Sequence, residues 1–199
     1  YQSSSSYAGN PYMIDLDELI NENLLNKDEV ESVFWGNDTS QVDFGNMFEQ
    51  RYPILEKAFS RFKPNKDYED FCQNNKDWLD DFALFMSLKE KFKYDMWIEW
   101  PEDIKLRKKP AVDKYTKELA QKINFHKFIQ FKFFEQFDKL KNYCHHRGIK
   151  LIGDVPIYVP LDSADVWSNP SMFQLDEDLN PIAVAGVPPD AFTADGQLW

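Results

Sequence analysis

The sequence is poor in cysteine and contains no long apolar run. Its 2 cysteines, Cys72 and Cys144, are far apart, so they indicate neither a disulfide framework nor a metal-binding spacing. This usage is typical of a reducing compartment, and we expect a cytoplasmic protein. No apolar stretch reaches the roughly 18 residues that a membrane helix needs, so we expect no membrane span.

Basic residues are also scarce. The chain has 23 Lys and Arg against 34 Asp and Glu, a formal net charge of −11 at pH 7. Because nucleic-acid binding depends on clustered Lys and Arg, this balance argues against a nucleic-acid partner. It is compatible with a neutral, hydroxyl-rich ligand, although solubility is the simpler explanation of the charge. The sequence contains no P-loop, GxGxxG, nucleophile elbow or HExxH motif, and we expect neither a cofactor nor a metal.

Apolar residues are abundant and recur at helical spacing. Hydrophobic residues make up 43% of the chain and aromatic residues 16%, which is enough for a packed core. The spacing predicts a helix that begins at Asp43, with Pro53 either kinking it or starting a new one. Residues 68–92 predict a helix pair or a single long helix. Residues 111–146 predict a long helix that stops at Gly148.

Residues 151–159 predict a buried strand. They are apolar on both faces except at Asp154, which is typical of a central strand in a parallel sheet. A helix, a glycine and a strand in this order form half of a β/α repeat. A full barrel of such repeats needs about 250 residues, and residues 151–159 are the one good barrel strand in this sequence, so we expect the remaining strands to lie outside this chain.

Asp154 is the sharpest candidate for a functional residue. A carboxylate within an apolar strand needs partners or a polar cavity, and sites in barrels lie at the C-terminal ends of strands. The alternative is a buried Asp that binds loop N–H groups. Asp162, Asp165 and Trp167 follow, where Asp162 or Ser163 capping a short helix is as well supported as a functional role.

The residues after 170 contain an acidic turn. Residues 176–180 match the start of a calcium-binding loop, but Pro181 stands where glycine is needed and Val187 where a bidentate Glu is needed. A hairpin turn between residues 172–175 and 182–184 is the better interpretation.

A stiff loop follows, in which Pro188 and Pro189 fix the backbone. This loop can hold Asp190, Gln197 and Trp199 in place for a ligand; the alternative is a rigid surface loop without one. Among the aromatic residues, Tyr1, Trp167 and Trp199 lie in predicted loops and are candidates to stack on sugar rings. Trp78, on an apolar helical stripe, is predicted to lie in the core.

Six segments, YQSSSSYAGNPYMIDL, DFALFMSLKEKF, the Trp-Pro of WIEWP, FHKFIQFKFFEQF, IGDVPIYVPLDSADVWSNP and VAGVPPDAFTADGQLW, share one resemblance. They resemble the 4-α-glucanotransferase family, also called amylomaltase or disproportionating enzyme (glycoside hydrolase family 77). The resemblance runs in order from Tyr1 to Trp199, and residues 150–199 are its most specific part. The sequence departs from the family at Pro160, where Ala is usual, and at Ala194, where some members have Glu.

The resemblance implies an α/β fold, a partial TIM (β/α)8 barrel with a largely helical insertion subdomain and a long loop that covers the substrate. By this resemblance, residues 1–115 are loop plus the insertion subdomain, and residues 116–199 are a barrel helix, a barrel strand and the substrate-covering loop of the incomplete barrel. It also implies an enzyme that cleaves an α-1,4 bond in a maltodextrin donor, holds the glycosyl group on an Asp, and passes it to a glucose or maltodextrin acceptor. By the same resemblance, the substrate-binding residues are Tyr1, Asp154, Asp190, Gln197 and Trp199.

The same resemblance places the nucleophilic Asp, the acid/base Glu and a third Asp after Trp199, so we expect no catalytic residue within this chain. A retaining mechanism needs two carboxyl groups about 5–5.5 Å apart, and Asp154 has no visible partner of that kind. The alternatives are an α-glucan hydrolase of the same clan and a non-catalytic glucan-binding fragment. We expect a piece of a longer protein that is inactive and poorly folded by itself, because its one parallel strand lacks neighbours. Neither the oligomeric state nor the acceptor preference follows from the sequence.

Overall fold

The computed structural model describes residues 3–38, 40–154 and 158–198. The chain divides into two compact units, and each unit combines separate stretches of sequence. The first unit comprises Tyr1–Ala8, Asp77–Ile123 and Gly153–Trp199, and the second comprises Gly9–Lys76 and Asn124–Ile152. The sequence predicts a different division, with a boundary after residue 115 between an insertion and a barrel. That boundary stays a prediction.

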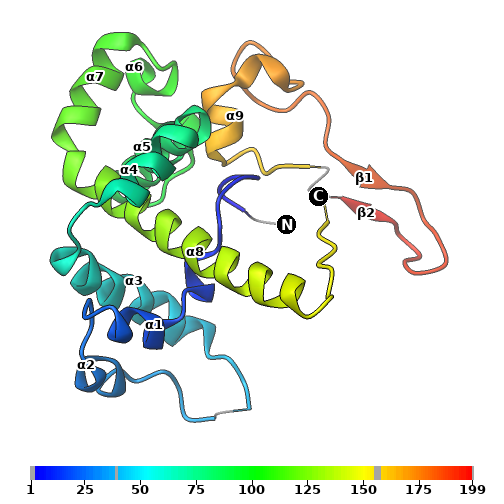
Figure 1. The fold of residues 1–199 in the computed structure, drawn as a ribbon. Helices are drawn as coiled ribbons and strands as arrows, with labels where there is room; N and C mark the ends of the chain where they lie inside the picture. Colours follow the sequence, from blue (N-terminus) through cyan, green and yellow to red (C-terminus); the bar gives the residue numbers. More distant parts are fainter. Residues whose placement is uncertain (1–2, 39, 155–157, 199) are drawn as a thin grey trace. The chain divides into compact units, whose positions relative to one another are not determined.

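Helices make up the regular structure described in the second unit (Figure 1). They are η1 (Pro11–Met13), α1 (Leu16–Asn21), α2 (Lys27–Glu31), α3 (Phe44–Arg61), α4 (Lys66–Asn74) and the larger part of α8 (Ala120–His146). The first unit contains mostly helices and one short hairpin. Its elements are α5 (Lys76–Lys91), η2 (Trp97–Glu99), α6 (Glu102–Lys105), α7 (Lys109–Glu118), the start of α8, α9 (Ala164–Ser168), η3 (Pro170–Met172), β1 (Gly186–Val187) and β2 (Gln197–Leu198).

Local signals set several helix ends where the sequence predicts them. Helix α3 follows Asp43, whose carboxylate accepts the Asn46 N–H at 3.0 Å and so satisfies a free donor of the first turn. The helix continues through Pro53, which is exposed, so the carbonyl that loses its partner can reach water. Helix α8 ends at His146, just before Gly148, the predicted stop, which has φ +73°. The Ile149 N–H then returns to the Cys144 carbonyl at 3.0 Å, as in a Schellman motif.

The two long helical predictions have different outcomes. Over residues 68–92 the chain forms two helices, α4 and α5. This confirms the predicted helix pair and not the alternative of a single long helix. The single helix predicted over residues 111–146 is wrong, because the chain leaves helical geometry at Leu119 (φ −102°, ψ 15°) between α7 and α8. Leu119 packs against the core of the first unit, and this tertiary contact overrides the continuous helical pattern.

The core of the second unit forms between α1, α3 and α8. Leu19, Leu55 and Phe128 are fully buried in it. Arg51 is also buried and donates hydrogen bonds to the carbonyls of Pro11, Tyr12 and Ile14. Burial lowers the pKa of Arg51 to about 10, so the side chain remains charged at neutral pH while it fixes the segment before α1.

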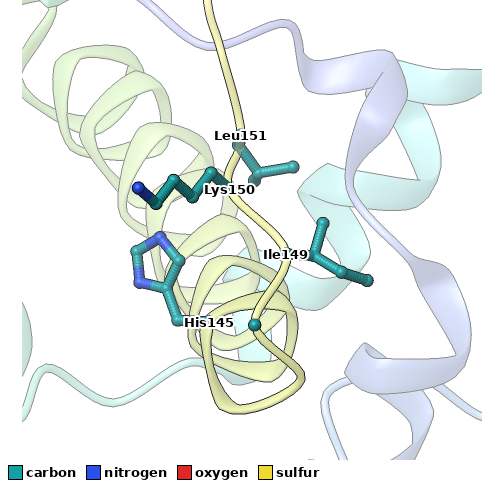
Figure 2. A pocket seen from close by; sticks show the side chains of 5 residues that line it. His145, Ile149, Lys150 and Leu151 are labelled. Atoms are coloured by element: carbon teal, nitrogen blue, oxygen red, sulfur yellow. The ribbon is translucent and has the colours of Figure 1, made fainter.

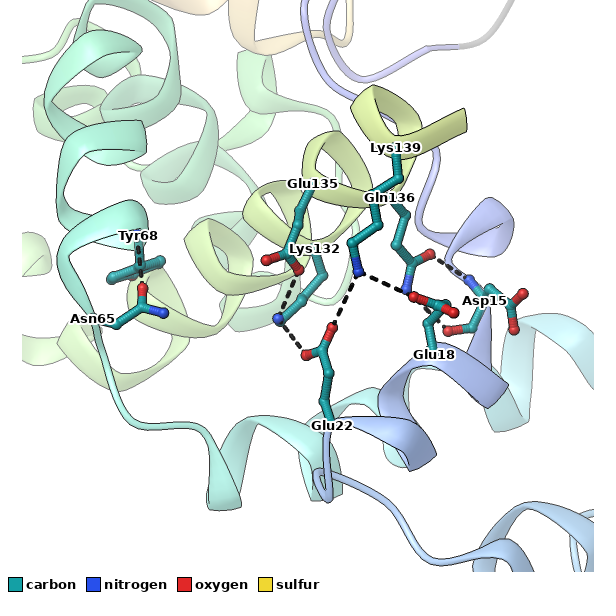
Figure 3. A network of polar contacts seen from close by, with 9 residues as sticks. All are labelled: Asp15, Glu18, Glu22, Asn65, Tyr68, Lys132, Glu135, Gln136 and Lys139. Atoms are coloured by element: carbon teal, nitrogen blue, oxygen red, sulfur yellow. Dashed lines mark hydrogen bonds and ion pairs between the residues drawn. The ribbon is translucent and has the colours of Figure 1, made fainter. Parts of the chain in front are cut away.

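A polar network joins α8 to α1 in the same unit (Figure 3). The Lys132 ammonium group is 2.8 Å from a Glu135 carboxylate oxygen and also binds Glu22. Gln136 accepts the Asp15 N–H at 2.7 Å, and Lys139 pairs with Glu18 at 3.0 Å. Because the Lys132 side chain is only 5% exposed, its two carboxylates are needed to offset the loss of hydration.

The core of the first unit contains Trp97, Phe85 and Trp167. The prediction that Trp167 lies in a loop and stacks on a sugar ring is wrong, because the side chain is 1% exposed. Its Nε1–H donates to the Ile104 carbonyl at 3.1 Å, and the Arg107 guanidinium lies 4.3 Å from the ring centroid. The cause is helix α9, which turns this tryptophan toward the core. Trp78 also packs against this core, as predicted.

The strand predicted over residues 151–159 is not formed in its described residues, 151–154 and 158–159. Ile152 is 96% exposed instead of buried. A central strand needs ladder partners on both sides. Among the described residues, the strands of the sheet are β1 and β2, which pair with each other. The described residues therefore show a mostly helical fold, and no α/β barrel is visible among them.

The helices of the described residues are too short or too polar to cross a membrane.

Candidate functional site

The predicted site residues all belong to the first unit. Tyr1 and Trp199 lie outside the described residues. Asp154 lies in the non-helical segment after α8 and is exposed. Gly153 precedes it in open space, since a Cβ at that position would have no atom within 4 Å. The structure therefore offers Asp154 to solvent rather than to a dry core, which removes the desolvation penalty that made its sequence position unusual.

Asp190 and Gln197 are brought together on one hairpin. Strand β1 pairs with β2 in antiparallel register, with Val187 opposite Gln197 and Gly186 opposite Leu198. A Cβ on Gly186 would lie 2.4 Å from the Gln197 carbonyl oxygen. This approach is too close for any other residue, so the glycine fixes how tightly the two chains meet.

The carboxylate of Asp190 organises the tip of this hairpin. Its Oδ1 accepts the Phe192 N–H at 2.8 Å and the Thr193 N–H at 2.9 Å. Its own N–H donates to the Thr193 carbonyl at 3.0 Å. This is the self-closing turn that Asp favours. One carboxylate oxygen of Asp190, a residue predicted to bind sugar, is thus engaged in holding the loop. The loop is therefore stiffened by this carboxylate as well as by the two prolines.

The acidic turn at residues 176–180 is a hairpin turn, as predicted. Asp176 accepts the N–H groups of Asp178 and Asn180 at 3.0 and 2.8 Å, and Leu175 bridges to Pro181. Its carboxylate is therefore used by the backbone of the turn. Within the part of the chain that the structure describes, no group of three or more His, Cys, Asp and Glu side chains is arranged to hold a metal ion.

Sequence reasoning missed the anchoring role of Asp162. Its carboxylate accepts from the Lys89 ammonium group at 2.6 Å and from the Trp97 N–H at 3.3 Å. The Lys89 side chain is only 9% exposed and also donates to the carbonyls of Tyr94 and Asp95. The helix cap is Ser163, whose hydroxyl accepts the Val166 N–H at 3.3 Å. No local pattern announces the Lys89–Asp162 pair, since the two residues are 73 positions apart.

Two cavities lie in the second unit, apart from these residues. One, of about 490 Å³, forms where the chain turns back after α8 and is lined by His145, Gly148, Ile149, Lys150 and Leu151. Figure 2 shows the side chains of His145 and Lys150 on one side of this segment and that of Ile149 on the other. A second cavity of about 220 Å³ is lined by Phe59, Phe62, Pro64, Tyr68 and Asn124. Burial raises the pKa of Tyr68, so its phenol stays protonated. Neither cavity contains a predicted site residue.

Comparison with known proteins gives consistent matches over the whole chain. The sequence model of the 4-alpha-glucanotransferase family matches residues 1–199. A 4-alpha-glucanotransferase from Clostridium butyricum is 47% identical over 202 residues, which cover 100% of this chain and 42% of that protein. A 4-alpha-glucanotransferase from Streptococcus pneumoniae is 44% identical over 203 residues, covering 100% of this chain and 40% of that protein.

The structural comparison agrees. The solved structure of an amylomaltase from Streptococcus agalactiae in complex with acarbose matches with a TM-score of 0.94 and 42% sequence identity. The match covers 100% of this chain and 41% of that one. The fold is therefore that of part of an amylomaltase. The chain belongs to the 4-alpha-glucanotransferase family, and it spans 40–42% of the length of the relatives named here.

Proposed function

We propose that residues 1–199 are part of a 4-α-glucanotransferase that transfers α-1,4-glucan segments between maltodextrins, in starch and maltodextrin metabolism. The observation that carries this proposal is the structural match to an amylomaltase bound to acarbose, at a TM-score of 0.94 over the whole chain. Acarbose is a carbohydrate-like ligand, which supports a maltodextrin donor and a glucose or maltodextrin acceptor. We also propose a cytoplasmic location, which is compatible with Cys72 and Cys144 not being joined in a disulfide.

We place this chain in the substrate-binding part of the enzyme. In a retaining double displacement, one carboxylate attacks the sugar and a second carboxyl group protonates the leaving oxygen. The proposal assigns these groups, the nucleophilic Asp and the acid/base Glu, to residues outside 1–199. Within the longer protein, residues 151–159 form a barrel strand and residues 170–199 the loop that covers the substrate.

The proposal gives the predicted site residues distinct roles. Asp154 binds sugar hydroxyls near the cleaved bond, which its exposed carboxylate suits. Asp190 holds the hairpin with one oxygen and offers the other to the substrate. Gln197 lies across from Val187 on the same hairpin. Tyr1 and Trp199 stack on sugar rings of the donor, and an aromatic, ordered loop of this kind excludes water so that a sugar acceptor is used instead.

Product analysis with maltotriose tests the proposal on the full-length protein. A transferase releases glucose and forms oligomers longer than maltotriose. A hydrolase of the same clan forms only shorter products, and a glucan-binding protein binds maltotriose without turnover. Either of these last two results would overturn the proposal.

Substitution of the binding residues tests their roles separately. We expect Tyr1→Ala, Trp199→Ala and Asp154→Asn each to lower kcat/KM for disproportionation of maltotriose by about tenfold or more, the size expected when a sugar contact is lost. Asp178→Asn serves as a control, because Asp178 lies in the exposed acidic turn. Equal kcat/KM for the site variants and the control would remove these residues from the binding site.

A further inference from the structure

The serines after Tyr1 form an ordered loop held by helix α9. The Ala164 N–H donates to the Ser4 carbonyl at 2.8 Å. The Ser5 hydroxyl donates to Asp165 Oδ1 at 3.2 Å, and the Ser6 N–H donates to Asp165 Oδ2 at 2.7 Å. Three consecutive serines are thus bound to two consecutive residues of the first turn of α9. The contact closes over 160 positions of sequence, so it is a tertiary contact and not a local turn.

The loop is fixed rather than draped over the surface. Ser5 is only 3% exposed, and its hydroxyl also accepts the Tyr7 N–H at 3.1 Å. The Tyr7 ring stacks on Trp78 of α5, with ring centroids 6.1 Å apart and an angle of 18° between the planes. Buried polar groups keep such partners because a buried donor or acceptor without one destabilises the fold. The loop is therefore attached to α9 at Ser4–Ser6 and to α5 at Tyr7.

Asp165 itself stands on a rigid support. The helix that carries it is capped by Ser163 and held by Trp167, which is buried and bonded to the Ile104 carbonyl. Asp162, which directly precedes the capping residue Ser163, forms an ion pair with Lys89. Since Ser163 already caps the helix, the Asp165 carboxylate is not needed for that purpose. Both of its oxygens instead face the serine loop, in charge-assisted hydrogen bonds that are stronger than neutral ones.

We propose that Asp165 is a positioning residue for sugar binding. Resting on the proposed function, Asp165 fixes Ser4–Ser6, which follow the proposed donor-binding residue Tyr1 in the sequence, against helix α9. Tyr1 lies outside the described residues, but the ordered loop begins at Ser3, two positions further on. Because Tyr1 is only two residues before Ser3 in the sequence, a carboxylate that holds this loop also limits the positions that Tyr1 can reach. Loss of the Asp165 carboxylate therefore weakens substrate binding without changing the rate of the bond-breaking step.

The test uses the full-length protein and steady-state disproportionation of maltotriose. We expect Asp165→Asn to raise KM about tenfold, the equivalent of one charged hydrogen bond, with kcat changed less than about twofold. Ser5→Ala removes one of the two hydrogen bonds to Asp165, together with the acceptor of the Tyr7 N–H, and raises KM about threefold by the same reasoning. Because both variants break the same contact, the double variant resembles Asp165→Asn alone.

Asp38→Asn is the matched control. Asp38 lies in the second unit and also accepts a serine N–H and hydroxyl, both from Ser40, so it loses the same kind of interaction without touching the serine loop. A KM for Asp165→Asn equal to that of Asp38→Asn overturns the inference. So does a fall in kcat at unchanged KM, or KM effects of Ser5→Ala and Asp165→Asn that multiply. If Asp165→Asn does not fold, the KM of Ser5→Ala is compared with that of Asp38→Asn. A higher KM for Ser5→Ala supports the inference, and equal KM values overturn it. Absence of transfer products from the unsubstituted protein overturns the proposed function and this inference together.

Discussion

The helical cores and the C-terminal stretch (residues 149–154 and 172–198) both contain many apolar side chains, yet only the cores bury them. Leu55 and Phe128 are fully buried, whereas Ile152 is 96% exposed and Phe192 is 91% exposed. A helix satisfies its backbone hydrogen bonds within one segment, but a strand needs a second strand. The comparison shows that apolar sequence alone buries a side chain only where the neighbouring element is present.

The largest effect is expected in the helical core. Phe128→Ala removes a ring that is 0% exposed and contacts Phe59 and Phe62, so we expect a loss of about 3–5 kcal/mol of unfolding free energy. Phe192→Ala in the C-terminal stretch serves as its control. Urea unfolding of the full-length protein, followed by circular dichroism, measures both, and the control should change stability by less than about 0.5 kcal/mol. Similar losses for the two variants would break the comparison.

The buried charge of the second unit gives the next effect. Lys132→Met leaves Glu22 and Glu135 facing each other without their shared cation. We expect a loss of about 2–3 kcal/mol, since breaking a largely buried ion pair is costly. The exposed pair of Lys27 and Glu31 is the control, and Lys27→Met should change stability by less than about 0.5 kcal/mol. Equal effects would mean that burial does not strengthen the Lys132 pair.

Ile152 sharpens the comparison because its expected effect depends on context. In residues 1–199 it is almost fully exposed, and Ile152→Ala should be within about 0.5 kcal/mol of neutral. In the full-length protein the proposed barrel strand buries the same side chain, and we expect a loss of about 2 kcal/mol or more. Unfolding of the two lengths in parallel gives the difference. A neutral substitution in both would contradict the proposed strand.

The smallest effect concerns pH. The Arg61 guanidinium, and then the Asn26 N–H, lower the pKa of Glu29 from 4.5 to about 2. Since the folded pKa lies below the unfolded one, the stabilisation is present above pH 4.5 and is lost as the pH falls toward 2. We expect the difference in Tm between the unsubstituted protein and Glu29→Gln to narrow between about pH 5 and about pH 3. A constant difference over this range would show that the pair does not depend on the ionised carboxylate.

The sequence predicts those features that depend on neighbouring residues. The helix start at Asp43 and the stop at Gly148 follow from capping chemistry within one turn. The break at Leu119 and the burial of Trp167 depend on packing against distant elements. The helical pattern of the local sequence does not predict such contacts. The strand predicted at residues 151–159 is absent from its described residues for the same reason, because partner strands are not among the described residues.

The candidate site divides in the same way. The resemblance to the family predicts that Asp154, Asp190 and Gln197 bind substrate. The turn-forming chemistry of Asp explains how Asp190 orders its hairpin. The attachment of the serine loop to Asp165 spans 160 positions, and a run of serines by itself predicts only a loop. Its function becomes visible only when the fold places α9 beside that run.

Hydrogen exchange of the Leu151–Asp154 amides, compared between residues 1–199 and the full-length protein, is the most direct test of the central claim. That claim is that this segment is a strand of a larger transferase barrel. Ladder amides exchange slowly because they open only with the strand. We predict fast exchange in residues 1–199 and strong protection in the full-length protein, while the α8 amides stay protected in both. Fast exchange of Leu151–Asp154 in the full-length protein would contradict the claim.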